Sequence, residues 1–198
     1  MSDPAPLDPT RYRGYLFDLD GTLIDTAPDI NGALNHALDR AGYEPVDEDL
    51  TRHWVGHGAR ACIEQALQHQ LGKKPPKRRV EPMLDDFLAY YRAHLSVHSR
   101  PYPGVLDALS ALRERGAALG VVTNKIGDLT IPLLDELTLL DTFQTVIAGD
   151  SAGKPKPAPE PVLMACAELR LEPGDVLFVG DSQTDVLAAR AAQCPVVC

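Results

Sequence analysis

The amino-acid sequence predicts an α/β fold in which helices flank a parallel sheet and a separate helical segment is inserted near the N-terminus. Four short apolar runs, rich in β-branched or aromatic residues, are too short for helices and therefore indicate buried strands. They are Tyr15–Phe17, Leu119–Val122, Thr145–Ala148 and Val176–Val179. Helical patterns lie between three of these runs, and strands that alternate with helices are typical of a parallel sheet covered on both faces.

The inserted segment lies between the first two strand runs, from about Thr26 to Arg100. This distance is too long for a simple crossover, and the segment carries its own helical patterns. Thr26-Ala27-Pro28-Asp29 predicts a helix start, with a capping hydroxyl, a proline in the first turn and an acid at N3, and Gly42 predicts its end. Two further helices are expected over Ala59–Gln70 and Val80–Val97.

A basic run, Lys73-Lys74-Pro75-Pro76-Lys77-Arg78-Arg79, lies between these two helices. Such a run is sometimes a nucleic-acid site. Here aromatic residues are absent from it and the formal net charge of the chain is −9, so we interpret it as a solvated loop between helices.

The remaining elements follow the inserted segment. Pro101-Tyr102-Pro103-Gly104 marks its exit, and the apolar spacing from Val105 to Leu112 predicts a helix that Gly116 ends. Another helical stripe covers Pro161–Leu169, and Pro195–Cys198 indicates the start of one more strand, with no helix after it. We therefore expect residues 1–25 and 101–198 to form a discontinuous core domain with a truncated C-terminus, and residues 26–100 to form a helical domain.

Composition narrows the possible partners. A chain of 198 residues fits one large domain or one domain with a smaller insertion, and its acidic charge repels nucleic acid and anionic membranes, so neither is expected as a partner. No apolar run approaches the ~20 residues that span a bilayer, and the polar, proline-rich N-terminus is unlike a secretory signal. The four cysteines show no zinc spacing and indicate buried, reduced thiols, so we expect a cytoplasmic protein.

Polar residues follow each strand run at once. They are Asp18-Leu19-Asp20-Gly21-Thr22, then Thr123-Asn124-Lys125, then Gly149-Asp150 with Lys154 and Lys156, and finally Gly180-Asp181-Ser182 with Asp185. In an open α/β sheet, ligands bind beyond the carboxyl ends of the strands. These four segments are therefore expected to meet at one site.

The chemistry of this set points to phosphoryl transfer. Asp18 and Asp20 are two residues apart, so both point the same way from an extended strand end, and Asp181 adds a third carboxylate. Clustered carboxylates repel unless a cation is present, and Mg²⁺ is the natural ion for oxygen ligands. Lys156 offers a positive charge to a phosphate oxygen, and Thr123 offers a hydrogen bond.

The four segments resemble the four signatures of the haloacid dehalogenase superfamily, and the resemblance covers nearly the whole chain. The matching residues are Asp18–Asp25, Thr123-Asn124, Lys156-Pro157 and Gly180–Asp185. The resemblance implies a Rossmann-like parallel sheet flanked by helices, with the inserted segment as a C1 cap domain. Within the superfamily, Trp54–Arg60 resembles the cap loop of the phosphoglycolate phosphatase group, where asparagine is expected at the position of His57.

The resemblance also implies a role for each core acid. Asp18 is the nucleophile that forms an aspartyl-phosphate, and Asp20 is first the acid and then the base. Mg²⁺ is held by Asp18, Asp181 and the backbone carbonyl of Asp20. Asp185 does not bind the metal directly but orients a metal-bound water or Lys156. An acid at position 20 argues for phosphoryl transfer, because a halide leaving group needs no proton.

The phosphate and the rest of the substrate are expected to contact other residues. Thr123, Asn124 and Lys156 hold the phosphate. Lys156 is preferred to Lys154 because it lies six residues after Asp150 and Pro157-Ala158-Pro159-Glu160 continues the match. From the cap, His57 and Arg60 are candidates for substrate contact, with Arg60 reaching a substrate carboxylate.

The expected function is therefore Mg²⁺-dependent hydrolysis of a small phosphorylated metabolite, with 2-phosphoglycolate as the leading candidate. Four different functions stay open beside it: a phosphatase for another sugar phosphate or a nucleotide, a β-phosphoglucomutase-like phosphomutase, a phospho-receiver-like module, and an inactive fragment. The sequence leaves the oligomeric state open.

Overall fold

The computed structural model describes residues 11–198. The predictions for residues 1–10, which concern the polar N-terminus and the start of the core domain, therefore lie outside the described residues. The main sheet has five parallel strands in the order β5-β4-β1-β6-β7. These are β1 (Gly14–Phe17), β4 (Ala118–Val122), β5 (Thr145–Ile147), β6 (Val176–Val179) and β7 (Val196–Val197). The predicted α/β class and the five predicted strands are confirmed.

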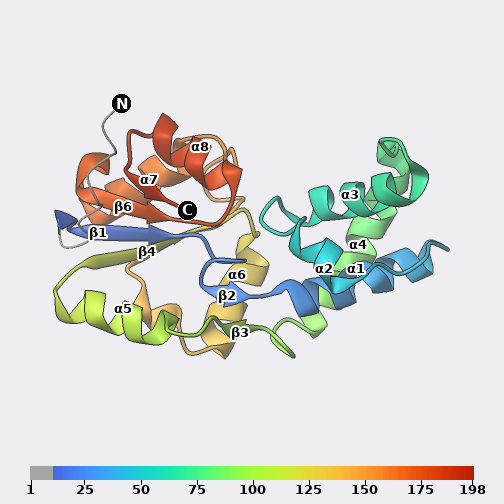
Figure 1. The fold of residues 1–198 in the computed structure, drawn as a ribbon, viewed down its shortest axis with the longest axis horizontal. Coiled ribbons are helices and arrows are strands. Elements are labelled where there is room, and N and C mark those ends of the chain that lie inside the picture. Colours follow the sequence, from blue (N-terminus) through green and yellow to red (C-terminus); the bar gives the residue numbers. More distant parts are fainter. Residues whose placement is uncertain (1–10) are drawn as a thin grey trace.

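Side-chain alternation on the central strand divides the core into two faces. Tyr15 and Phe17 belong to one apolar cluster and Leu16 to the other, as expected for the period of two in a strand. Helices α5 (Val105–Glu114) and α6 (Gly127–Glu136) cover the first face, and α7 (Glu160–Leu169) and α8 (Gln183–Ala191) cover the second (Figure 1). The short 3₁₀ helices η2 (Leu140–Thr142) and η3 (Pro173–Asp175) also belong to this part.

The inserted segment forms a helical body beyond one end of the sheet (Figure 1). It contains α1 (Ala27–Arg40), α2 (Glu48–Arg52), α3 (Ala59–Leu71) and α4 (Lys77–Ala93). Helices α1 and α3 both pack on α4. The predicted α1 and α3 are confirmed, while the short α2 was not predicted, since five residues are too few to show a helical period.

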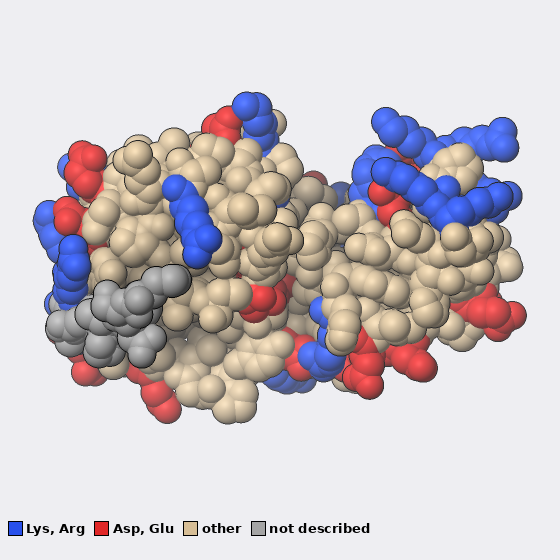
Figure 2. All heavy atoms as spheres, turned by 45° about the horizontal axis from the view of Figure 1, so that its top comes forward, with Lys and Arg blue, Asp and Glu red and all other residues tan. Residues whose placement is uncertain are grey.

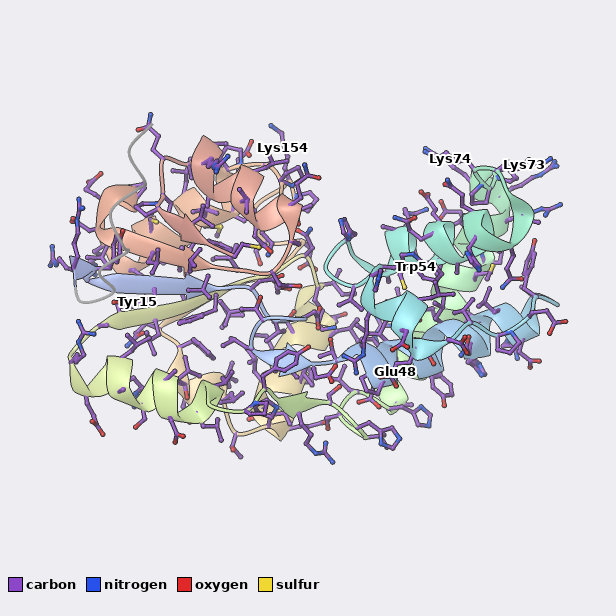
Figure 3. All side chains as sticks on the ribbon, in the orientation of Figure 1. Tyr15, Glu48, Trp54, Lys73, Lys74 and Lys154 are labelled. Atoms are coloured by element: carbon purple, nitrogen blue, oxygen red, sulfur yellow. The ribbon has the colours of Figure 1, made fainter. Side chains whose placement is uncertain are left out.

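The prediction for α4 is wrong at both ends. The helix begins at Lys77, directly after Pro76 in an extended conformation, so the last part of the basic run is helical and not a loop. It ends at Ala93, four residues before the predicted end at Val97, which is exposed. The basic side chains gather at the end of the helical body, where Lys73 and Lys74 point outward (Figures 2 and 3).

Two short strands join the helical body to the core where the chain enters and leaves it. Strand β2 (Ile24–Asp25) pairs antiparallel with β3 (Arg100–Pro101), a pairing that the sequence did not reveal. Beside it, the buried carboxylate of Asp29 accepts hydrogen bonds from the backbone N–H groups of His98 (3.0 Å) and Ser99 (2.7 Å) and from the Ser99 hydroxyl (2.7 Å). Asp29 therefore links the two connections, and the domain limits at 25/26 and 100/101 stay predictions.

Two further observations concern membranes and thiols. Among the described residues, none of the helices has the length and apolar character needed to cross a bilayer. Cys62, Cys166 and Cys194 are free and buried, as predicted, but Cys198 is free and exposed because it follows the short terminal strand.

Candidate active site

The site lies at the carboxyl ends of β1, β4 and β6, whose register is level: Phe17 is opposite both Val121 and Val179. Asp18 directly follows β1, and its backbone N–H donates to the carbonyl of Val179 (2.9 Å), which extends the sheet by one residue. The backbone therefore fixes the position of the Asp18 side chain.

The Asp18 carboxylate is buried, with 1% of the residue exposed. Its Oδ1 accepts from the backbone N–H of Leu19 (2.7 Å) and pairs with the ammonium of Lys156 (2.8 Å). Its Oδ2 is buried and has no hydrogen-bond partner among the described residues. Such an atom is costly to bury and marks a position where a bound group would add a favourable contact.

Lys156 reaches the site from the loop between β5 and α7, and it is buried between two acids. Its Nζ lies 2.8 Å from Asp18 Oδ1 and 2.6 Å from Asp185 Oδ1, and it donates to the backbone carbonyl of Val122 (2.7 Å). Burial alone would lower the pKa of Lys156, but these two acids outweigh it and raise the pKa above its ordinary value. The ammonium is therefore charged at neutral pH.

Asp185 is held by a capping box at the start of α8. Its Oδ2 accepts from the backbone N–H (3.0 Å) and the hydroxyl (2.5 Å) of Ser182, and its own N–H donates to that hydroxyl (3.4 Å). This places Oδ1 against Lys156. Gly180 is required here, because a Cβ at that position would lie 2.6 Å from the Asp185 side chain.

Asp181 completes an acidic cluster at the surface of the site. Its Oδ1 accepts from the hydroxyl of Thr22 (2.7 Å). One carboxylate oxygen each from Asp18, Asp181 and Asp185 lie within 4.8 Å of one another. Burial raises the pKa of Asp18 to about 7. The positive charge of Lys156 opposes this rise, and the negative charges of Asp185 and Asp20 add to it. A hard divalent cation fits this donor set, because it would contact the partnerless oxygen and neutralise the repulsion.

Asp20 lies outside this cluster and faces the helical body. Its Oδ1 accepts from the hydroxyl of Thr26 (2.7 Å) and pairs with the ammonium of Lys125 (3.0 Å). Thr26 was predicted to cap α1, but its side chain makes no capping hydrogen bond and serves Asp20 instead. Lys125 in turn donates to the hydroxyl of Tyr91 on α4 (2.9 Å).

Sequence reasoning assigned no role to Lys125 or Tyr91. A lysine directly after Thr123-Asn124 at a strand end was a signal for Lys125. Tyr91 lies within an ordinary helical pattern and gave no signal.

Thr123 and Asn124 lie beside the acids, at the end of β4. The hydroxyl of Thr123 accepts from the backbone N–H of Lys125 (3.1 Å). The side-chain amide of Asn124 donates to the carbonyls of Gly56 (3.2 Å) and Lys156 (3.1 Å), and its Oδ1 is buried without a hydrogen-bond partner among the described residues. Both amide hydrogens are therefore in use between the helical body and the site, and phosphate binding by Thr123 and Asn124 stays a prediction.

A cavity of about 250 Å³ separates this site from the helical body. Asp20, Asn124 and Lys125 line it from the sheet side, and its opposite wall is mostly apolar, including Trp54 and Phe87. The two predicted cap residues also line it: His57 is exposed, while Arg60 forms a two-pronged pair with Glu81 (2.6 and 2.9 Å).

Lys154, the lysine not chosen for the phosphate site, lies at the surface (Figure 3), where it pairs with Glu160 (2.7 Å). It reaches neither Asp18 nor Asp185 by any ion pair of the described residues, in contrast to Lys156.

Comparison with known proteins finds a matching family model and similar proteins. Residues 15–198 match the model of the haloacid dehalogenase-like hydrolases. A phosphoglycolate phosphatase of Nitrosococcus oceani is 39% identical over 92% of this chain and 81% of its own length. An N-acetylmuramic acid 6-phosphate phosphatase of Pseudomonas aeruginosa is also 39% identical, over 92% and 79%. A solved structure, that of a predicted phosphoglycolate phosphatase of Haemophilus somnus, superposes with a TM-score of 0.85 at 33% identity, over 96% of this chain and 85% of that one.

Proposed function

The chain belongs to the haloacid dehalogenase-like hydrolase family and is a phosphatase-like enzyme, and from that premise we propose that it hydrolyses 2-phosphoglycolate with Mg²⁺ through an aspartyl-phosphate on Asp18. The observation that carries the proposal is the buried Asp18 carboxylate, which has one oxygen paired with Lys156 and the other without a partner among the described residues. Lys156 holds this carboxylate in place, and its ammonium would lie beside the phosphate that Asp18 attacks.

In the first step Asp18 attacks phosphorus, while Lys156 neutralises charge on a phosphoryl oxygen and Asp20 gives a proton to the leaving oxygen. In the second step Asp20 takes a proton from the water that attacks the aspartyl-phosphate. Bound Mg²⁺, held by Asp18, Asp181 and the backbone carbonyl of Asp20, would supply further neutralisation of the phosphoryl charge. Asp185 is engaged by Lys156 and Ser182 and keeps the lysine in place.

The substrate part of the proposal rests on the relatives and on the cap loop. The Nitrosococcus oceani relative is named for phosphoglycolate, and His57 and Arg60 line the cavity beyond Asp20. Arg60 would have to exchange Glu81 for the substrate carboxylate. Their ion pair is exposed and screened by solvent, so it contributes little to stability and the exchange is inexpensive.

A phosphate-release assay with Mg²⁺ tests the proposal. The panel comprises 2-phosphoglycolate, hexose phosphates, nucleoside monophosphates and N-acetylmuramic acid 6-phosphate, the compound named for the Pseudomonas relative. We expect the highest kcat/KM with 2-phosphoglycolate. A better substrate elsewhere in the panel would contradict the substrate assignment alone, whereas a folded sample that releases phosphate from no member would contradict the phosphatase proposal.

Two further readouts distinguish a phosphatase from a phosphomutase and from a phospho-receiver. A phosphomutase would return the phosphoryl group to a hexose phosphate, which analysis of the products detects. A phospho-receiver would accumulate long-lived phosphate on Asp18 without steady turnover, which intact-protein mass spectrometry detects.

A further inference from the structure

A buried hydrogen bond and a buried ion pair connect the helical body to Asp20. Tyr91 comes from α4, whereas Lys125 and Asp20 follow β4 and β1 (Figure 1). The ammonium of Lys125 lies between them, 2.9 Å from the Tyr91 hydroxyl and 3.0 Å from Asp20 Oδ1. These three residues are at most 7% exposed. The catalytic steps proposed above make no use of Lys125 or Tyr91.

Burying the charged ammonium of Lys125 costs free energy, so its presence in the interior requires an explanation. Moving an ammonium out of water costs several kcal/mol unless it is well paired, and an apolar side chain of similar size would pack there without this cost. Burial alone would lower the pKa of Lys125, but Asp20 and Tyr91 outweigh it and raise the pKa. The Tyr91 ring adds a cation–π contact at 4.6 Å from Nζ to its centroid.

The backbone of Lys125 is fixed as firmly as its ammonium. Its N–H donates to the Thr123 hydroxyl (3.1 Å), and its carbonyl accepts from the Thr130 hydroxyl (3.1 Å) and the Gly149 N–H (2.9 Å). Both ends of the side chain are therefore held. A rigid donor of this kind orients its acceptor.

The contacts on Asp20 are one-sided. Oδ1 receives both the Thr26 hydroxyl (2.7 Å) and the Lys125 ammonium (3.0 Å), while Oδ2 makes no hydrogen bond within residues 11–198. Asp20 also lines the cavity that separates the site from the helical body. With Oδ1 held by two donors, Oδ2 is the oxygen left to exchange a proton.

We propose that Lys125 is a positioning residue for Asp20, held in turn by Tyr91 of the helical body, and that it keeps Oδ2 of Asp20 directed at the leaving oxygen. The inference rests on the proposed phosphatase function. It makes proton donation to the leaving group depend on contact between α4 and the core, because removal of the Tyr91 hydroxyl removes one of the two groups that fix the ammonium.

The test compares two substrates that differ in their need for an acid. An alkyl phosphate such as 2-phosphoglycolate expels a basic alkoxide and needs the proton of Asp20, whereas p-nitrophenyl phosphate expels a stable phenolate and does not. The value of kcat/KM reports the steps through formation of the phosphoenzyme, so it isolates the acid role of Asp20 from its later role as a base.

Lys125→Met keeps the apolar part of the side chain and removes the charge. We expect it to lower kcat/KM for the alkyl phosphate by about 10- to 100-fold and for p-nitrophenyl phosphate by less than about 3-fold. Tyr91→Phe should show the same selectivity with a smaller loss of about 3- to 10-fold. Lys154→Met, which removes an exposed lysine outside the site, should leave both substrates unchanged.

A second measurement uses Asp20→Asn as the background. If Lys125 acts through Asp20, the double variant with Lys125→Met should fall within about twofold of Asp20→Asn alone on the alkyl phosphate, because residues that act as a unit are non-additive. A purely structural role for Lys125 would add its full loss again and would overturn the proposal.

The outcomes distinguish the two proposals. An inactive wild-type enzyme on both substrates contradicts the proposed function itself. An active wild type in which Lys125→Met lowers both substrates equally, with a melting temperature like that of the wild type, contradicts the positioning role alone. If Lys125→Met does not fold, Tyr91→Phe decides: equal losses on the two substrates overturn the proposal, and a selective loss on the alkyl phosphate supports it.

Discussion

Replacing Asp18 with asparagine should abolish turnover and at the same time stabilise the metal-free protein at neutral and higher pH. The activity loss follows from removing the nucleophile and should be at least about 10³-fold. The stability gain follows from burial. The amide oxygen keeps the contacts of Oδ1 with Leu19 and Lys156, while the amide nitrogen takes the place of the partnerless Oδ2 and can donate toward the neighbouring acids.

The sign and size of this gain follow from the pKa of Asp18, which burial raises from its ordinary 3.8 to about 7. The folded protein therefore binds more protons than the unfolded chain between these values. Its contribution to stability is fully present below pH 3.8 and is lost as the pH rises through about 7. Each pH unit in this window is worth about 1.4 kcal/mol, so between about pH 5.5 and about pH 8 the wild type should lose roughly 2 kcal/mol that Asp18→Asn does not lose.

Urea unfolding of both proteins in the presence of a chelator, at the two pH values, measures the difference. Addition of Mg²⁺ at about 100 times its Kd should then stabilise the wild type by about 2.7 kcal/mol and the variant much less. Parallel pH dependences in the two proteins would refute the reasoning from burial, and substantial phosphatase activity in Asp18→Asn would refute the covalent route.

Three further outcomes are expected. Gly21→Ala should lower phosphatase activity at least about tenfold, because Gly21 has φ +89° and an added Cβ would lie 2.5 Å from Asp181 Oδ2. Gly174→Ala should be neutral in the same assay, because an added Cβ there would meet no neighbouring atom within 4 Å. Asp29→Ala should lower the free energy of unfolding by about 3 kcal/mol in urea titrations, since it leaves the buried N–H of Ser99 without its acceptor and the Ser99 hydroxyl with only the longer contact to the Leu95 carbonyl (3.5 Å); a change below about 1 kcal/mol would argue against a linking role. A chelator should reduce phosphate release to background and added Mg²⁺ should restore it, and activity that persists without divalent ions would rule out the metal's role.

Much of the core could be read from local patterns, because the features that define it are local. A strand such as Tyr15–Phe17 can be recognised from its composition and length. Successive side chains within it then alternate between the two faces of the sheet. The acids Asp18 and Asp20 follow that strand directly, so their place at the carboxyl edge needed only the rule that parallel strands end together.

Helix ends in the helical body were harder to predict, because packing decides them as much as propensity does. Helix α4 begins directly after Pro76, three residues earlier than the apolar pattern suggested. Its last predicted turn, which would end at the exposed Val97, is absent. Arg60 likewise has a partner, Glu81, that lies 21 residues away in the sequence and one helix away in space. No local pattern contains that pairing.

The sequence by itself determined which residue types stand at the ends of the strands, and with them the class of chemistry. Only the tertiary structure decided which of those groups touch. Asp185 lies 29 residues from Lys156, and Tyr91 lies 34 residues from Lys125, yet both pairs are buried and in contact. The physical reason is that a buried charge must find a partner of opposite or polar character wherever the packed elements bring one within reach, and that proximity is a property of the assembled fold.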